Sequence, residues 1–184
     1  MKKVCALLLA LVMAFSLAAC TRGGNLEGEA TENGGTDQTP GGLENENGTA
    51  EDQSLASRLV DDFKTLLNTD NMMGGRALVD ELLKSDRLSF ESKVTDVQPG
   101  KLTGFKGEIT GFKEGVMFAP TKSDVPFIGY VFTLEDNTDV ESFVKMLRSN
   151  ADVEWNETAK AEEMMAEGLG KMVFFVMSPK SLDK

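Results

Sequence analysis

The sequence contains no histidine and only two cysteines, Cys5 and Cys20. Without histidine, the chain has no Ser-His-Asp or Cys-His catalytic set, no histidine-ligated zinc and no imidazole to act as a general base near neutral pH. Cys5 lies in an apolar N-terminal run that we expect to be removed, which leaves Cys20 alone. One cysteine excludes an intrachain disulfide and a zinc site built from several thiolates in the processed chain.

Basic residues are also scarce. Nineteen lysines and arginines stand against 30 aspartates and glutamates, which gives a formal net charge of -11. Lys2 and Lys3 belong to the N-terminal run, so the remaining chain would carry 17 basic residues against 30 acidic ones. An acidic surface repels the phosphates of nucleic acids and of anionic lipids. We therefore expect no nucleic-acid partner and no polybasic contribution to membrane binding.

The first twenty residues, MKKVCALLLALVMAFSLAAC, have the parts of an export signal. Lys2 and Lys3 precede an apolar run of about a dozen residues, shorter than the ~20 that a transmembrane helix needs. Leu17-Ala18-Ala19-Cys20 then resembles the lipobox of bacterial lipoproteins. The resemblance implies removal of residues 1–19 and a diacylglyceryl group on Cys20, whose two acyl chains suffice for durable anchoring. The alternative is an ordinary signal peptide with an incidental cysteine.

Residues 20–53 differ sharply in composition from the rest of the chain. They carry eight glycines, eight acidic residues and one arginine, with Leu26 and Leu43 as the large apolar side chains. This composition cannot bury enough apolar surface to offset the entropy lost on ordering. We predict a flexible tether that holds the following domain away from the membrane. Residues 54–184 carry regular apolar patterns over the length of one domain.

Apolar spacing and capping residues predict four helices in this domain. The predicted helices are 54–67, 76–84, 138–148 and 158–167. Ser54 is the expected N-cap of the first, and Thr138 and Glu141 form a capping box at the start of the third. Strands are predicted around 88–94, 116–119, 127–134 and 172–177, and the last two have the apolar runs of strands buried on both faces. The repeated Thr-Gly-Phe-Lys at 103–106 and 110–113 suggests tight bends between buried rings.

This order of elements predicts the α+β class. We expect a single small domain in which one antiparallel or mixed sheet has its helices packed on one face. The strands 127–134 and 172–177, with the helix between them, would form a split crossover unit.

Two motifs suggest chemistry. Ser142-Phe-Val-Lys145 matches the S-x-x-K of penicillin-recognising enzymes, but the accompanying S-D-N and K-T-G motifs are missing. We therefore interpret Ser142 and Lys145 as neighbours on the outer face of a helix. A nearby turn gathers oxygen ligands of the kind that calcium prefers, without the EF-hand spacing. These residues are Glu135, Asp136, Asn137 and Asp139. We predict helix capping there and keep a weak calcium site as the alternative.

Other residue pairs have structural explanations that we favour. Met72-Met73 and Met164-Met165 carry thioethers that suit cuprous copper, but methionine more often fills cores. Asp61-Asp62 and Glu162-Glu163 are successive residues, which do not face each other on a helix, so we expect solvated surfaces. Trp155, the single tryptophan, is expected in the core, with stacking on a sugar or peptide as the alternative. We predict no catalytic residue, no metal site and no cofactor.

The region from Leu102 to Pro179 is similar to small uncharacterised lipoproteins of Gram-positive anaerobes. The similarity rests on TGFKEGVMFAP (110–120), PFIGYVFTL (126–134), Asp139-Val140-Glu141 with Phe143, Trp155-Asn156 and VFFVMSP (173–179). It implies a lipid-anchored, single-domain protein in a Gram-positive host. It implies no activity, ligand or catalytic residue.

These features predict a lipid-anchored accessory or binding module on the extracytoplasmic face of the cell membrane, and not an enzyme. Its partners would be the membrane, through Cys20, and an envelope protein or wall component. One alternative is a cell-envelope hydrolase that uses carboxylate, Ser, Lys or Tyr130 chemistry. The other is a small-ligand receptor of a transporter. A deep pocket lined by inward carboxylates would favour the hydrolase, and a second lobe with an interlobe cleft would favour the receptor.

Overall fold

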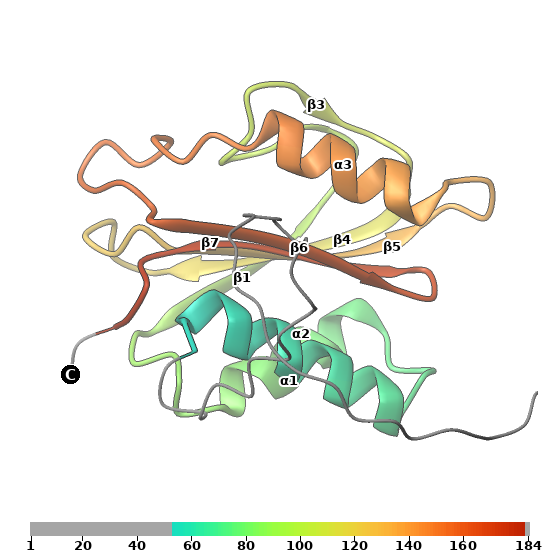
Figure 1. Cartoon of the computed structure of the whole chain (residues 1–184), viewed down its shortest axis with the longest axis horizontal. Helices are drawn as coiled ribbons and strands as arrows, with labels where there is room; N and C mark the ends of the chain where they lie inside the picture. The colour runs from blue at the N-terminus through green and yellow to red at the C-terminus, as the bar shows by residue number, and fades with distance from the viewer. Residues whose placement is uncertain (1–52, 183–184) are drawn as a thin grey trace, which may run out of the picture. The chain divides into compact units, whose positions relative to one another are not determined.

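Two amphipathic helices open the part of the chain that the computed structural model describes, residues 53–182 (Figure 1). Helix α1 covers Leu55–Thr69 and helix α2 covers Gly75–Lys84. The Ser54 hydroxyl accepts a hydrogen bond from the Ser57 N–H at 3.3 Å, which confirms the predicted N-cap. No helix within residues 53–182 has the length and apolar character needed to cross a membrane. The predicted signal, lipobox and most of the tether lie outside the described residues.

Five strands form one antiparallel sheet in the order β1-β4-β5-β7-β6. The strands are β1 (Ser92–Val97), β4 (Phe112–Pro120), β5 (Ile128–Leu134), β6 (Glu163–Leu169) and β7 (Met172–Ser178). Two short strands, β2 (Gly100–Lys101) and β3 (Glu108–Ile109), pair separately, and the third helix, α3 (Val140–Asn150), follows β5. β5 and β7 are interior strands and almost wholly buried, as their apolar runs predict.

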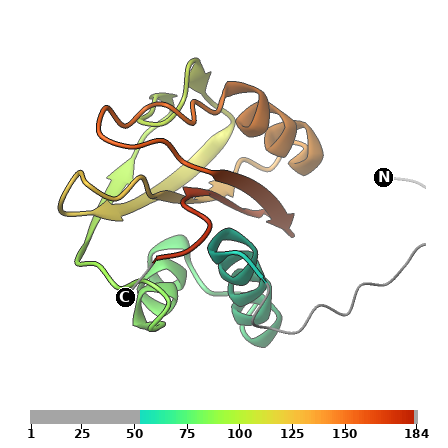
Figure 2. The ribbon, with the colours of Figure 1, turned by 60° about the vertical axis from the view of Figure 1, so that its left-hand side comes forward.

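The predicted α+β class and antiparallel sheet are confirmed, but the helices lie on both faces of the sheet (Figures 1 and 2). α1 and α2 pack on one face, where Phe174 and Val176 of β7 belong to their core. α3 packs on the opposite face, where Val173 and Phe175 belong to a second core. Since β5 and β7 are apolar on both sides, each face must be covered.

The predicted helix over 158–167 is wrong, because the second half of this segment forms the edge strand β6 and the first half is irregular. Glu, Met and Ala are good helix formers, so local propensity favours a helix here. Pairing with β7 prevails over that propensity, in a continuous register from Glu163↔Ser178 to Leu169↔Met172. Gly170 adopts φ +61° in the two-residue turn between the strands. It therefore makes a hairpin turn rather than ending a helix.

The split crossover exists with different strands from those predicted. β5 and β6 are each antiparallel to β7, which lies between them, so β5 and β6 are parallel to each other. The chain crosses from β5 through α3 to β6 and then returns as β7. The segment 172–177 is therefore the inserted strand rather than the second strand of the crossover.

The bends predicted at the Thr-Gly-Phe-Lys repeat are confirmed. Gly104 and Gly111 have φ values of +82° and +93°, a region that side-chain-bearing residues rarely adopt. The rings that follow them, Phe105 and Phe112, are buried in the core beneath α3. The two glycines thus let the chain turn sharply and place a ring on the α3 face of the sheet.

Candidate functional site

The exposed apolar side chains of the described chain gather at one end of the sheet. Among residues 53–182, the large apolar side chains that stand exposed are Met72, at 88%, and Leu169, at 37%. Both line a hollow of about 550 Å³, which we call the distal hollow. Thr133 and parts of three segments, 67–74, 113–114 and 169–172, form its walls. Leu67 and Met172, which also line it, belong to the core.

Local backbone features build this hollow. The Asp70 carboxylate accepts a hydrogen bond from the Met72 N–H at 3.0 Å, and the Met73 N–H donates to the Asp70 carbonyl at 3.2 Å. This turn leaves Met72 exposed while Met73 packs partly on the core. On the opposite wall, the register of β4 and β5 shifts between Phe112 and Glu114, and Lys113 and Glu114 are both exposed. The bulge therefore supplies charged groups to a hollow whose inner wall is apolar.

The distal hollow lies at the opposite end of α1 from residue 53. The Leu55 N–H donates to the Lys180 carbonyl at 2.9 Å, so the beginning and the end of the described chain meet there. Leu67, near the other end of α1, lines the hollow. Leu55 and Leu67 are twelve positions apart, which corresponds to about 18 Å at the helical rise of ~1.5 Å per residue. Figure 1 shows the C-terminal segment and the β6–β7 turn at opposite ends of the sheet.

A lysine occupies the carbonyl oxygens of the turn that was a candidate for calcium. The Lys171 ammonium donates to the carbonyls of Asp136 and Thr138 at 3.0 and 3.1 Å, with Glu135 at 3.5 Å. Lys171 therefore takes up backbone carbonyls that would otherwise be open to a cation, and the carboxylate of Asp139 caps α3. Within residues 53–182, no group of three or more His, Cys, Asp or Glu side chains is placed to hold a metal ion.

The predicted capping box is wrong by one residue. The Thr138 hydroxyl donates to the Gly111 carbonyl at 2.7 Å and does not cap α3. Asp139 is the N-cap, and its carboxylate accepts the Ser142 N–H at 2.8 Å. Hydrogen bonds from the Ser142 side chain and backbone lower the pKa of Asp139, because they stabilise the carboxylate. Since Ser142 serves this cap, the S-x-x-K pair has a structural explanation.

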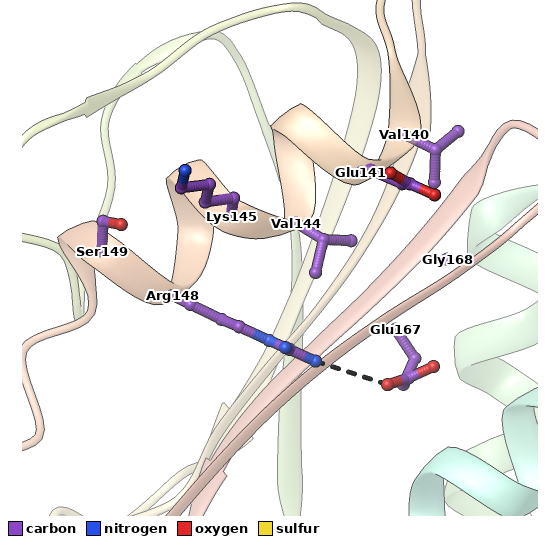
Figure 3. Close-up of a pocket in the computed structure, with 8 residues that line it drawn as sticks. All are labelled: Val140, Glu141, Val144, Lys145, Arg148, Ser149, Glu167 and Gly168. Atoms are coloured by element: carbon purple, nitrogen blue, oxygen red, sulfur yellow. Dashed lines mark hydrogen bonds and ion pairs between the residues drawn. The ribbon is translucent and has the colours of Figure 1, made fainter.

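A second hollow, of about 510 Å³, lies between α3 and the edge strand β6 (Figure 3). Glu167 of β6 pairs with Arg148 of α3 and with Lys64 of α1, each at 3.3 Å. Arg148 also donates to the Ala166 carbonyl at 2.6 Å. In Figure 3, Lys145 extends away from the Arg148–Glu167 pair. These contacts cover part of the β6 edge, which would otherwise offer its backbone to another strand.

The remaining candidates do not converge on a site. The Tyr130 hydroxyl is buried and donates to the Thr103 carbonyl at 2.8 Å, and burial raises its pKa far above the ordinary value. Asp62 pairs with Arg87 at 2.7 Å, whereas Asp61 lies exposed on α1. Trp155 is partly buried against the α3-side core, in accord with its predicted core position.

The two carboxylates of Glu162-Glu163 are also separated. Glu162 is exposed and accepts the Lys180 N–H at 2.9 Å. Glu163 is half-buried and opens the edge strand β6. They belong to an extended segment, so the helical surface predicted for them is wrong, although their lack of convergence agrees with the prediction.

The methionine pairs have different environments. Met164 packs on the α3-side core and Met165 on the α1/α2-side core, so successive residues of β6 face opposite ways. Met72 and Met73 both line the distal hollow, where Met172 joins them. Sequence reasoning missed Met172, because no spacing links residue 172 to residue 72.

Comparisons of this chain with family models, curated proteins and solved structures gave no match. Functional reasoning therefore starts from the residues of the chain itself.

Proposed function

We propose that this chain is a lipid-anchored extracytoplasmic binding module that presents the distal hollow to an envelope partner or ligand. The observation that carries the proposal is the pairing of exposed Met72 and Leu169 at one hollow. Single exposed apolar residues are common on protein surfaces and need no explanation. Two of them beside an apolar inner wall have the character of a binding site. Methionine suits such a surface because its flexible side chain adapts to different shapes.

The position of the hollow supports the same proposal. A tether that joins the domain at residue 53 would attach it to the membrane through Cys20. The distal hollow lies at the other end of α1, and so its approach is not crowded by the point of attachment. An anchored module of this kind would keep its binding end available to proteins or polymers of the envelope.

Binding fits the candidate side chains better than hydrolysis does. The hydroxyls of Tyr130 and Ser142 and the carboxylate of Asp139 each have a structural hydrogen bond. The lining of the distal hollow includes one carboxylate, that of Glu114, and two lysines. Such a set offers no pair of carboxylates to share acid and base roles.

Site-specific photocrosslinking in cells tests the proposal. A photoreactive residue would replace Met72 in the full-length chain, and the matched control would carry it at Lys122, an exposed residue just beyond the other end of β4. We expect a discrete crosslinked product from position 72, weaker or absent from position 122. The substitution Leu169→Asp should reduce that product. Equal products from both positions would contradict the proposed role of the distal hollow.

The anchor has a separate test. Cell fractionation should place the wild-type chain with the membrane and the Cys20→Ala chain in the soluble extracytoplasmic fraction. The crosslink from position 72 should weaken with Cys20→Ala if the partner is itself in the membrane. A wild-type chain found in the soluble fraction would overturn the lipid-anchor part of the proposal.

A further inference from the structure

Three methionines line the distal hollow: Met72, Met73 and Met172. They come from the α1–α2 connection and from the start of β7, which lie almost a hundred residues apart in the sequence. A methyl group built on Gly75, at the start of α2, would lie 3.8 Å from the Met172 terminal methyl. The end of the Met172 side chain thus lies close to the segment that carries Met73.

Core filling does not account for all three side chains. Met172 is 8% exposed and does belong to the core, but Met72 is 88% exposed and fills no internal gap. Met73 is intermediate and packs against the same core. The exposures of the three residues thus form a gradient from the inner wall of the hollow to solvent.

One of the sulfur atoms is held by a hydrogen bond. The Thr133 hydroxyl donates to the Met172 sulfur at 3.3 Å. A thioether sulfur has two lone pairs, so this bond leaves one for another partner. The Met172 sulfur is thus held on the inner wall, whereas Met72 stands exposed among the residues that line the same hollow.

Thioether sulfur selects soft metal ions, of which cuprous copper is the biological example. The chain offers no histidine, and its cysteines lie outside residues 53–182, so thioethers are the soft ligands of this domain. The lining of the distal hollow includes one carboxylate, that of Glu114, and within residues 53–182 no three His, Cys, Asp or Glu side chains are grouped to hold a hard divalent cation. Neutral thioethers favour a monovalent ion.

We propose that the distal hollow binds cuprous copper through the sulfur atoms of Met72, Met73 and Met172. This inference deepens the proposed function and rests on it, since it names a ligand class for the same hollow. Met164 and Met165, although adjacent, lie on opposite faces of β6 and form no such site.

Methionine-methyl NMR on the full-length chain in detergent tests the inference. Cys5→Ser and Cys20→Ser remove the thiols that would compete for the metal. Silver(I) is added as a redox-stable stand-in for copper(I), and anaerobic competition with a copper(I) chelator then measures affinity. We expect the methyl signals of Met72, Met73 and Met172 to shift together. The other methionines supply internal references.

Matched variants decide whether the three sulfur atoms are the ligands. Leucine conserves most of the methionine volume, so M72L/M73L/M172L removes the ligands with little change in packing. We expect this variant to lose copper(I) affinity by about tenfold or more, since even the loss of an outer-shell partner costs 10–100-fold. The control, M164L/M165L, should keep wild-type affinity. Methyl spectra without metal verify that each variant is folded.

The failure of this inference differs from the failure of the proposed function. If silver shifts none of the three methyl signals while the crosslink from position 72 remains specific, the metal inference is wrong and the binding module stands. Uniform shifts of all methionines, or equal affinity in the wild type and M72L/M73L/M172L, would also overturn the metal inference.

Discussion

The two faces of the sheet are covered by different kinds of structure. Helices α1 and α2 cover one face, and they contribute mostly leucine and valine at helical spacing. The other face is covered by the single helix α3 and by the segment 102–109, which is irregular apart from the short strand β3. Buried aromatic rings are more numerous there than on the first face, and Phe105 lies 4.7 Å from Phe175 and 5.6 Å from Tyr130, measured between ring centroids.

Dimensions explain the difference. Five strands about 4.8 Å apart span roughly 19 Å, whereas one helix with its side chains covers about 10 Å. Two helices therefore cover the first face, and α3 alone leaves about half of the second face uncovered. Segment 102–109 covers part of the remainder with Leu102, Phe105 and Ile109, and its one ring, Phe105, buries a large area for a single residue. One sheet thus shows two ways of burying an apolar face.

Adjacent phenylalanines of β7 offer the most severe test of this comparison. Phe174 stacks on Phe63 of α1 at 5.4 Å, and Phe175 packs on Phe105. Both are fully buried, so F174A and F175A should each lower the free energy of unfolding by about 3–5 kcal/mol, as measured by urea denaturation.

Hydrogen exchange then separates the two faces. F175A should speed exchange at Lys106, whose N–H donates to the Asn150 carbonyl at 2.8 Å, more than it affects α1. F174A should have the opposite pattern. A cost below about 1 kcal/mol for either variant would mean that the corresponding face is not required for stability.

A glycine opposite a ring tests how tightly the α1/α2 side is packed. Gly129 of β5 pairs with Phe118 of β4, and a methyl group built on Gly129 would lie 2.3 Å from the Phe118 ring. G129A should therefore cost about 1–3 kcal/mol through overpacking. F118L should relieve the clash, so the double variant should cost less than the sum of the single ones. If the double variant costs as much as the two single variants together, the Phe118 ring is not what excludes a side chain at residue 129.

The next residue of β5 tests the opposite face with a smaller change. Tyr130 is the neighbour of Gly129, and its hydroxyl ties the sheet to the irregular segment at the Thr103 carbonyl. Y130F keeps the ring and removes this bond, which should cost about 1 kcal/mol. Hydrogen exchange should quicken in segment 102–109 and not in α1. Equal quickening in both would indicate that the hydroxyl supports the whole fold rather than one face.

Sequence patterns predicted the elements whose apolar spacing is strong. α1, α2, β5 and β7 appear close to their expected bounds, because their burial depends on periodicity or on uninterrupted apolar runs. β6 was missed because its residues favour helix and its strand conformation comes from pairing with β7. The two-residue turn that begins with Gly170 is a hairpin signal that could have identified it.

The distal hollow could not be predicted from the sequence. Its walls join Met72, Lys113 and Leu169, which are brought together only when β4 and β6 take their places in the sheet. The partial exposure of each side chain is likewise a property of the assembled end of the sheet. By contrast, Tyr130 sits in an apolar run that already predicts its burial, although not the hydrogen bond to Thr103.

The N-cap residues of α1 and α3 predict that the two faces of the sheet respond differently to acid. α1 is capped by the Ser54 hydroxyl, which does not titrate in this range, whereas α3 is capped by the Asp139 carboxylate. Hydrogen bonds from Ser142 hold the pKa of Asp139 below its ordinary value, so the folded chain binds this proton more weakly than the unfolded chain does. The contribution of Asp139 is therefore complete above the unfolded pKa and is lost as the pH falls through the folded pKa.

This linkage predicts that acid loosens α3 before α1. D139N keeps a capping oxygen without the charge, so its stability should differ from wild type at neutral pH and approach it at an acid pH below the folded pKa of Asp139. Urea midpoints at the two pH values, with hydrogen exchange in α1 and α3, measure the effect. D136N, in the same turn but without a capping bond, is the matched control. A wild-type advantage over D139N that persists unchanged in acid would mean that the charge of Asp139 does not hold α3 on its face of the sheet.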